Sequence, residues 1–146
     1  MIIDDAPLLY PYDAKAFSAR FNQKCLLGEF EEAIQVCDVA IELNSENGLP
    51  YSRRGNAKNQ MGDFRGAIQD CNIAIEKCAD NAYAYFTRGI AKRALEDYGG
   101  AMKDFLKAVE LDAGEVKKYF NHNYAKTVLV DGARVHSDKK KSINEL

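Results

Sequence analysis

The sequence predicts an all-α solenoid of three antiparallel helix pairs followed by a C-terminal capping helix. Two observations lead to this prediction. Residue types recur at a spacing of 34 residues along most of the chain, and within each such unit the apolar residues follow helical spacing. The length of 146 residues and the apolar content of 47% are sufficient for one short solenoid with a buried core.

The 34-residue period recurs at aromatic, basic, small and acidic positions. The matching sets are Phe17, Tyr51, Tyr85 and Tyr119; Arg20, Arg54 and Arg88; Lys24, Lys58, Lys92 and Lys126; Phe30, Phe64 and Tyr98; Ala33, Ala67 and Ala101; Ala40, Ala74 and Ala108; and Glu42, Glu76 and Glu110. So many coincidences at one spacing indicate an internal repeat. The predicted organisation is an N-terminal arm (1–13), three units (14–47, 48–81 and 82–115), a half-repeat forming a capping helix (116–130) and a polar tail (131–146).

Each unit is expected to contain two helices. In the second unit, Pro50 suits the first turn of a helix, and the sequence Met61-Gly62-Asp63 ends that helix. Asp63 then caps the next helix, as Asp97 does one unit later. The predicted helices are 14–27, 30–44, 48–61, 64–78, 82–95, 98–112 and 115–130.

Small residues on the period indicate where paired helices meet. Gly55 and Gly89 lie in the first helix of their units, and Ala67 and Ala101 lie in the second. Residues without bulk allow two antiparallel helices to approach closely, so we expect these four positions to face each other within their pairs. One pair cannot bury its apolar face alone, but about three stacked pairs can.

This pattern resembles the tetratricopeptide-repeat family, whose units carry an aromatic residue, a small residue, a second aromatic residue and two further small residues. The second unit has Tyr51, Gly55, Phe64, Ala67 and Ala74, and the third has Tyr85, Gly89, Tyr98, Ala101 and Ala108. The first unit follows with Phe17, Phe30, Ala33 and Ala40, but departs by placing Phe21 where the family has a small residue. The resemblance implies a right-handed superhelix whose concave groove, lined by the first helix of each unit, binds an extended or helical peptide.

The family's groove positions transfer onto residues that differ between units. The predicted contacts to a peptide are Asn22, Arg53, Asn56, Tyr83, Phe86, Arg93 and Tyr124. The wider set of groove-facing positions adds Ser18, Cys25, Ser52, Asn59, Thr87, Ile90, Phe120, Asn121 and Thr127. Packing demands repetition, so residues that vary between units are freer to serve recognition. The alternative is that Phe86, Phe120 and Tyr124 simply pack the last helix against its neighbour.

One branch of the family grips the C-terminal carboxylate of heat-shock chaperones with two lysines, two asparagines and one arginine. Only Asn22 matches that set. The other four positions hold Ser18, Arg53, Tyr83 and Thr87. Binding of a chaperone tail through this clamp is therefore disfavoured.

The repeated arginines are assigned a structural role. Asp70 and Asp104 recur on the same period as Arg54 and Arg88, which predicts ion pairs Arg54–Asp70 and Arg88–Asp104 between the paired helices. Val36 replaces the acid in the first unit, so Arg20 would lack that partner. The competing interpretation is a basic stripe that contacts the ligand.

Composition limits the remaining functions. A net charge of −2 gives no broad basic field for nucleic acid. No apolar run approaches the roughly 20 residues that span a bilayer, so no membrane contact is predicted and a cytoplasmic protein is expected. The four cysteines form no C-x-x-C motif, so neither metal nor cofactor is predicted, and Cys37 and Cys71 are expected to fill the core.

No catalytic motif occurs in the sequence, so the protein is not predicted to be an enzyme. The leading functional prediction is a scaffold or adaptor that binds a protein or peptide partner in its groove. The alternative is a structural subunit that docks through its N-terminal arm or its solenoid ends, for example as a homo-oligomer.

Overall fold

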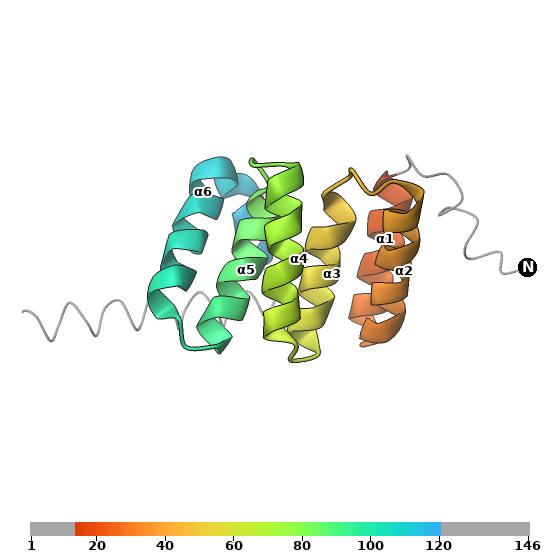
Figure 1. The fold of residues 1–146 in the computed structure, drawn as a ribbon, viewed down its shortest axis with the longest axis horizontal. Coiled ribbons are helices and arrows are strands. Elements are labelled where there is room, and N and C mark those ends of the chain that lie inside the picture. Colours follow the sequence, from red (N-terminus) through yellow and green to blue (C-terminus); the bar gives the residue numbers. More distant parts are fainter. Residues whose placement is uncertain (1–13, 121–146) are drawn as a thin grey trace, which may run out of the picture.

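The fold is built of helices only over residues 14–120, which are the residues that the computed structural model describes. The helices are α1 (Ala14–Leu26), α2 (Phe30–Leu43), α3 (Leu49–Gln60), α4 (Phe64–Lys77), α5 (Ala82–Ala94) and α6 (Tyr98–Phe120). Figure 1 shows them side by side in chain order, from α1 at one end of the molecule to α6 at the other. Each of the pairs α1–α2, α3–α4 and α5–α6 is antiparallel, and each packs on the next, as predicted.

Helix α6 contains a kink that separates two helical segments. Asp112 has an extended backbone, with φ −160° and ψ 87°, between helical neighbours. The described part of the chain therefore holds seven helical segments in six continuous elements. The predicted break between helices 98–112 and 115–130 is confirmed, but it is a single residue and not a loop. Residues 121–130 of the last predicted helix lie outside the described residues.

Side-chain caps fix where the second helices begin. The Asp63 carboxylate accepts a hydrogen bond from the Gly66 amide at 3.0 Å, and the Asp97 carboxylate accepts one from Gly100 at 3.0 Å. Both caps were predicted, and each satisfies an amide that has no partner within its helix. Asn81 caps α5 in the same way by accepting from Ala84. Pro50 lies in the first turn of α3, where its missing amide hydrogen costs nothing.

The small residues lie where paired helices touch. A β-carbon built on Gly55 would lie 3.0 Å from the Cys71 sulfur, and one on Gly89 would lie 2.6 Å from a ring carbon of Phe105. Ala67 and Ala101 are buried opposite them. The prediction that these positions allow close approach is confirmed. Phe21, which replaces the glycine in the first pair, is itself buried and stacks on Phe17.

The core consists of side chains trapped between helix pairs, including two of the four cysteines. Cys37 and Cys71 are fully buried, as predicted, and burial raises the pKa of both thiols, so they stay protonated. Cys25 is part-buried and packs against the edge of the core, whereas Cys78 is exposed. No helix in residues 14–120 is long and apolar enough to cross a membrane.

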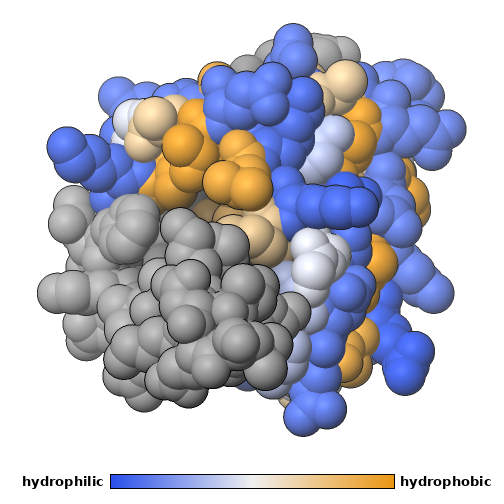
Figure 2. All heavy atoms as spheres, turned by 90° about the vertical axis from the view of Figure 1, so that its left-hand side faces the viewer, coloured by the Kyte–Doolittle hydropathy of each residue, from blue (hydrophilic) through white to orange (hydrophobic). Residues whose placement is uncertain are grey.

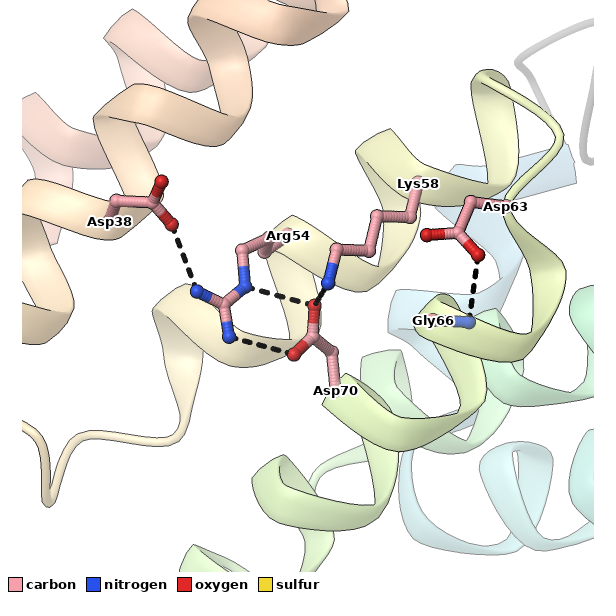
Figure 3. A network of polar contacts seen from close by, with 6 residues as sticks. All are labelled: Asp38, Arg54, Lys58, Asp63, Gly66 and Asp70. Carbon is pink, nitrogen blue, oxygen red and sulfur yellow. Dashed lines mark hydrogen bonds and ion pairs between the residues drawn. The ribbon is translucent and has the colours of Figure 1, made fainter.

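The predicted ion pairs between paired helices are present. Arg54 donates two hydrogen bonds to the Asp70 carboxylate at 2.9 and 2.8 Å, and Arg88 binds Asp104 with the same two distances. Figure 3 shows that Lys58 also contacts Asp70, at 2.9 Å, and that Arg54 reaches back to Asp38 of the preceding pair, at 2.9 Å. The sequence had not indicated these two additional partners. Since their charges are occupied within the protein, Arg54 and Arg88 serve structure.

Candidate functional site

The first helices of the second and third units meet on one side of the solenoid. Helix α3 contacts α5 directly, whereas no comparable contact joins α2 with α4, or α4 with α6, in the described chain. This is the side of the solenoid on which we expect the concave surface, because the first helices of two units meet there. We refer to this side, formed by α1, α3 and α5, as the groove.

Three of the predicted groove residues meet in one cluster between α3 and α5. The guanidinium carbon of Arg53 lies 3.5 Å from the centre of the Tyr83 ring, which is a cation–π contact. The Asn56 amide nitrogen donates a hydrogen bond to the Tyr83 hydroxyl at 2.6 Å. We call Arg53, Asn56 and Tyr83 the groove cluster.

Local sequence explains how this cluster forms. Arg53 and Asn56 are three residues apart on α3 and therefore share one helix face. Tyr83 is the second residue of α5, two residues after the cap at Asn81. Its ring therefore lies near the N-terminal end of α5, where it contacts Arg53 and Asn56 of α3. The sequence gives one indication of this cluster, which is that both of its contacting residues depart from the repeat. The residues equivalent to Arg53 in the other units are Ala19 and Thr87, and those equivalent to Tyr83 are Lys15 and Leu49.

Burial and charge set the protonation of the cluster. Burial raises the pKa of Tyr83 from 10.0 to about 12, and the charge of Arg53 and the bond from Asn56 oppose that shift. Burial likewise raises the pKa of the Cys25 thiol on α1 to about 11, again opposed by Arg53. Near neutral pH the phenol and the thiol are therefore neutral, and Arg53 supplies the positive charge of this region.

Four residues of the wider predicted set are internal to the protein. Asn59 is buried and donates from its amide nitrogen to the Thr87 carbonyl at 2.9 Å, which joins α3 to α5. Thr87 is 2% exposed, and Ser52 is fully buried with its hydroxyl bonded to the Leu49 carbonyl. Ile90 is also a core residue. All four positions are therefore packed inside the protein, which the sequence did not distinguish from open groove positions.

The remaining predicted contacts fall into different environments. Phe86 is buried and packs on Phe105, with ring centres 5.5 Å apart, near Val116 of α6. This placement agrees with the packing alternative. Asn22 is exposed on α1, and Arg93 is part-buried near the end of α5. Tyr124, Asn121 and Thr127 lie outside the described residues. Within residues 14–120, no group of three or more histidine, cysteine, aspartate or glutamate side chains could hold a metal ion.

Comparison with known proteins identifies related folds. Residues 82–115, the third unit of the period, match the sequence model of the tetratricopeptide repeat. The first TPR domain of human RPAP3 is 25% identical, with a TM-score of 0.70 over 90% of this chain and 98% of that domain. The Arabidopsis OM64 TPR domain is 26% identical, with a TM-score of 0.65 over 82% of this chain and 93% of that domain.

A third solved structure contains a ligand. The second TPR domain of human RPAP3, in complex with the HSP70 peptide SGPTIEEVD, is 25% identical, with a TM-score of 0.63 over 80% of this chain and 92% of that domain. No protein with curated function matches the sequence significantly.

Proposed function

The chain belongs to the tetratricopeptide-repeat family, and from this premise we propose that it is a non-catalytic scaffold that binds a peptide or a segment of a partner protein in its groove. The observation that carries the proposal is the groove cluster. Arg53, Asn56 and Tyr83 place a cation, an amide and an aromatic ring next to one another in the groove. Such groups bind backbone amides, acidic groups and apolar side chains without any chemical step.

Support also comes from what the repeat leaves unexplained. The period accounts for residues that pack helices and for the arginine–aspartate pairs, which all have partners inside the protein. The groove cluster breaks the period and yet is ordered by contacts across two units. An ordered polar and aromatic surface binds a ligand with less loss of side-chain entropy than a mobile one.

The likeness to a chaperone-binding domain raises a narrower hypothesis. The second TPR domain of human RPAP3 was solved with an HSP70 peptide. In the present chain, the positions that grip a chaperone tail hold Ser18, Asn22, Arg53, Tyr83 and Thr87, and only Asn22 keeps the expected residue type. We therefore propose a peptide ligand of a different kind.

The experiment is selection of peptides from a random display library on the full chain, followed by calorimetric titration of one selected peptide. We expect Asn56→Ala to weaken binding about fivefold to tenfold, because it removes the hydrogen bond that holds the Tyr83 ring in place within the groove cluster. The control is Gln69→Ala, which changes an exposed amide on the second helix of the same pair. Equal affinities for both variants and the unaltered protein would place the site elsewhere.

A second candidate function is docking through the end of the solenoid. Figure 2 shows a hydrophobic patch on the face at the α6 end, with hydrophilic side chains next to it. Leu106 and Val109 of α6 are 62% and 44% exposed. A solenoid end that leaves apolar residues in water suits contact with another chain. If this face joins two copies, the mass measured in solution will exceed that of one chain, and Leu106→Asp will reduce it to that of one chain. A mass of one chain at high protein concentration would contradict a homo-oligomer.

A further inference from the structure

Two neighbouring arginines on α3 have opposite surroundings. Arg54 is held by the carboxylates of Asp70 and Asp38. Arg53 has no carboxylate within ion-pair distance among residues 14–120 and lies instead over the Tyr83 ring. Its Nη1 atom is out of contact with solvent and has no hydrogen-bond acceptor in that part of the chain. Among the described residues, the Arg53 guanidinium therefore lacks the anion that usually accompanies a part-buried charge.

The surroundings of Arg53 also define which carboxylate would fit. Thr87 stands at one of the five clamp positions but is 2% exposed, so it is closed to a ligand. Tyr83 stands at another, where it supplies a ring face already covered by Arg53. Ser18 and Asn22, at two more, are uncharged. Of the five clamp positions, Arg53 is the one that carries a positive charge.

A peptide that ends in aspartate, such as SGPTIEEVD in the RPAP3 complex, has two carboxylates on its last residue, the side chain and the terminus. The five clamp positions of this chain supply one guanidinium, which can neutralise one of them, and the second would be desolvated at those positions near a neutral phenol. A single carboxylate on the side chain of an internal residue avoids this second charge.

Resting on the proposed peptide-binding function, we propose that the groove selects a peptide segment with an internal aspartate or glutamate, whose side-chain carboxylate pairs with Arg53 beside Tyr83, and that it does not require a free C-terminus. The carboxylate would accept hydrogen bonds from the guanidinium edge while the Tyr83 ring keeps the guanidinium plane in place. Asn56 holds the Tyr83 hydroxyl and so positions the ring.

The test uses nine-residue peptide mixtures with one fixed central residue and otherwise random positions. The central residue is Glu or Gln, and the C-terminus is either amidated or free, which gives four probes. Affinity for the full chain is measured by fluorescence anisotropy. We expect the Glu mixtures to bind about tenfold more tightly than the Gln mixtures, the equivalent of one charge-assisted contact, and amidation to change affinity by less than about twofold.

Arg53→Gln should abolish the preference for Glu, and Arg53→Lys should restore part of it. Arg65→Gln is the matched control, because Arg65 is exposed on α4 outside the groove. It should leave the preference unchanged. Thermal unfolding of each variant checks that the fold is intact.

Each other outcome contradicts the inference in a distinguishable way. If a free C-terminus is required, the ligand is a terminal carboxylate. If Arg53→Gln keeps the preference for Glu, a cation other than Arg53 binds the carboxylate of the peptide. If the mixtures bind with no preference but Asn56→Ala still weakens them, the groove function stands and only the acidic specificity fails. If no mixture binds, the proposed peptide-binding function fails as well.

Discussion

Asp70 shows how a single side chain connects two helices of a pair. Its carboxylate is almost fully buried, and it accepts two hydrogen bonds from Arg54 and contacts Lys58. A buried carboxylate is costly unless it is paired and hydrogen-bonded, and here two cations satisfy it. Asp38, the other acid on Arg54, is 52% exposed and makes one contact. The two aspartates therefore bind the same arginine, but we expect Asp70 to contribute more to stability than Asp38.

We predict that Asp70→Ala lowers the free energy of unfolding by about 2–4 kcal/mol, because it leaves two part-buried cations without their shared anion. Asp38→Ala should cost less than about 1 kcal/mol, since its contact is open to water. Urea unfolding followed by circular dichroism measures both. Equal losses would mean that burial does not decide the strength of these pairs.

The Tyr83 phenol makes a pH-dependent contribution to stability. Burial raises its pKa from 10.0 to about 12 in the folded protein. The folded state thus holds the proton more tightly than the unfolded state, so the stabilisation is complete below pH 10 and is lost as the pH rises toward 12. We predict falling stability across this window, with a shallower fall in Tyr83→Phe, which cannot ionise.

The cysteines titrate in an overlapping range, because the pKa of Cys25 is raised to about 11. Comparison of the unaltered protein with Tyr83→Phe separates the two, since the cysteines are present in both. Thermal unfolding at a series of alkaline pH values is the measurement. If stability falls with pH equally steeply in both proteins, the pKa of Tyr83 is the same in the folded and the unfolded state.

At the scale of elements, the turn inside each helix pair contains a residue with positive φ, which is glycine in two pairs and glutamate in the third. Gly28 and Gly62 have φ of 73° and 84°, and the corresponding residue of the third pair, Glu96, has φ of 67°. This left-handed conformation is easy for glycine and strained for residues with a β-carbon. The third pair therefore carries local strain that the other two pairs avoid.

We predict that Glu96→Gly stabilises the protein by about 0.5–1 kcal/mol, because relief of this strain outweighs the greater flexibility of the unfolded chain. The mirror substitution, Gly62→Ala, should destabilise it by about 1 kcal/mol, since nothing crowds its β-carbon and only the backbone opposes it. Thermal unfolding of both variants tests the pair. A destabilising Glu96→Gly would show that the Glu96 side chain makes a compensating contact.

At the scale of the whole molecule, helix pairs depend on their neighbours. Helix α3 contacts α2, α4 and α5, and α4 contacts α5, so the middle pair is covered on both sides. The buried hydrogen bond from Asn59 to Thr87 and the exposed one from Arg88 to Asn72 both cross from one pair to the next. Stability in such a stack comes from interfaces between units as well as from the units themselves.

We predict that a fragment of residues 1–81, which lacks α5 and α6, is largely unfolded, because α3 and α4 lose the pair that covers them. Its helical circular dichroism per residue should fall well below that of the full chain, without a cooperative melting transition. A fragment that melts cooperatively with undiminished helicity would show that two pairs are sufficient.

The sequence by itself determined the helices, their pairing and the ion pairs within each pair. Caps at Asp63 and Asp97, close contacts at Gly55 and Gly89, and the pairs Arg54–Asp70 and Arg88–Asp104 all involve residues on the 34-residue period. These features are predictable because they are local or repeated. A contact made in one unit must be made in the next if the residues recur.

Only the tertiary structure decided which of the varying residues face the groove. Ser52, Asn59 and Phe86 vary between units as Arg53 and Asn56 do, yet the first three are buried and the other two join the groove cluster with Tyr83. The reason is physical. Variation shows only that packing does not demand one residue type in every unit, whereas exposure depends on the angle at which neighbouring helices meet. That angle is set by all the side chains between the helices at once, so no single position in the sequence reveals it.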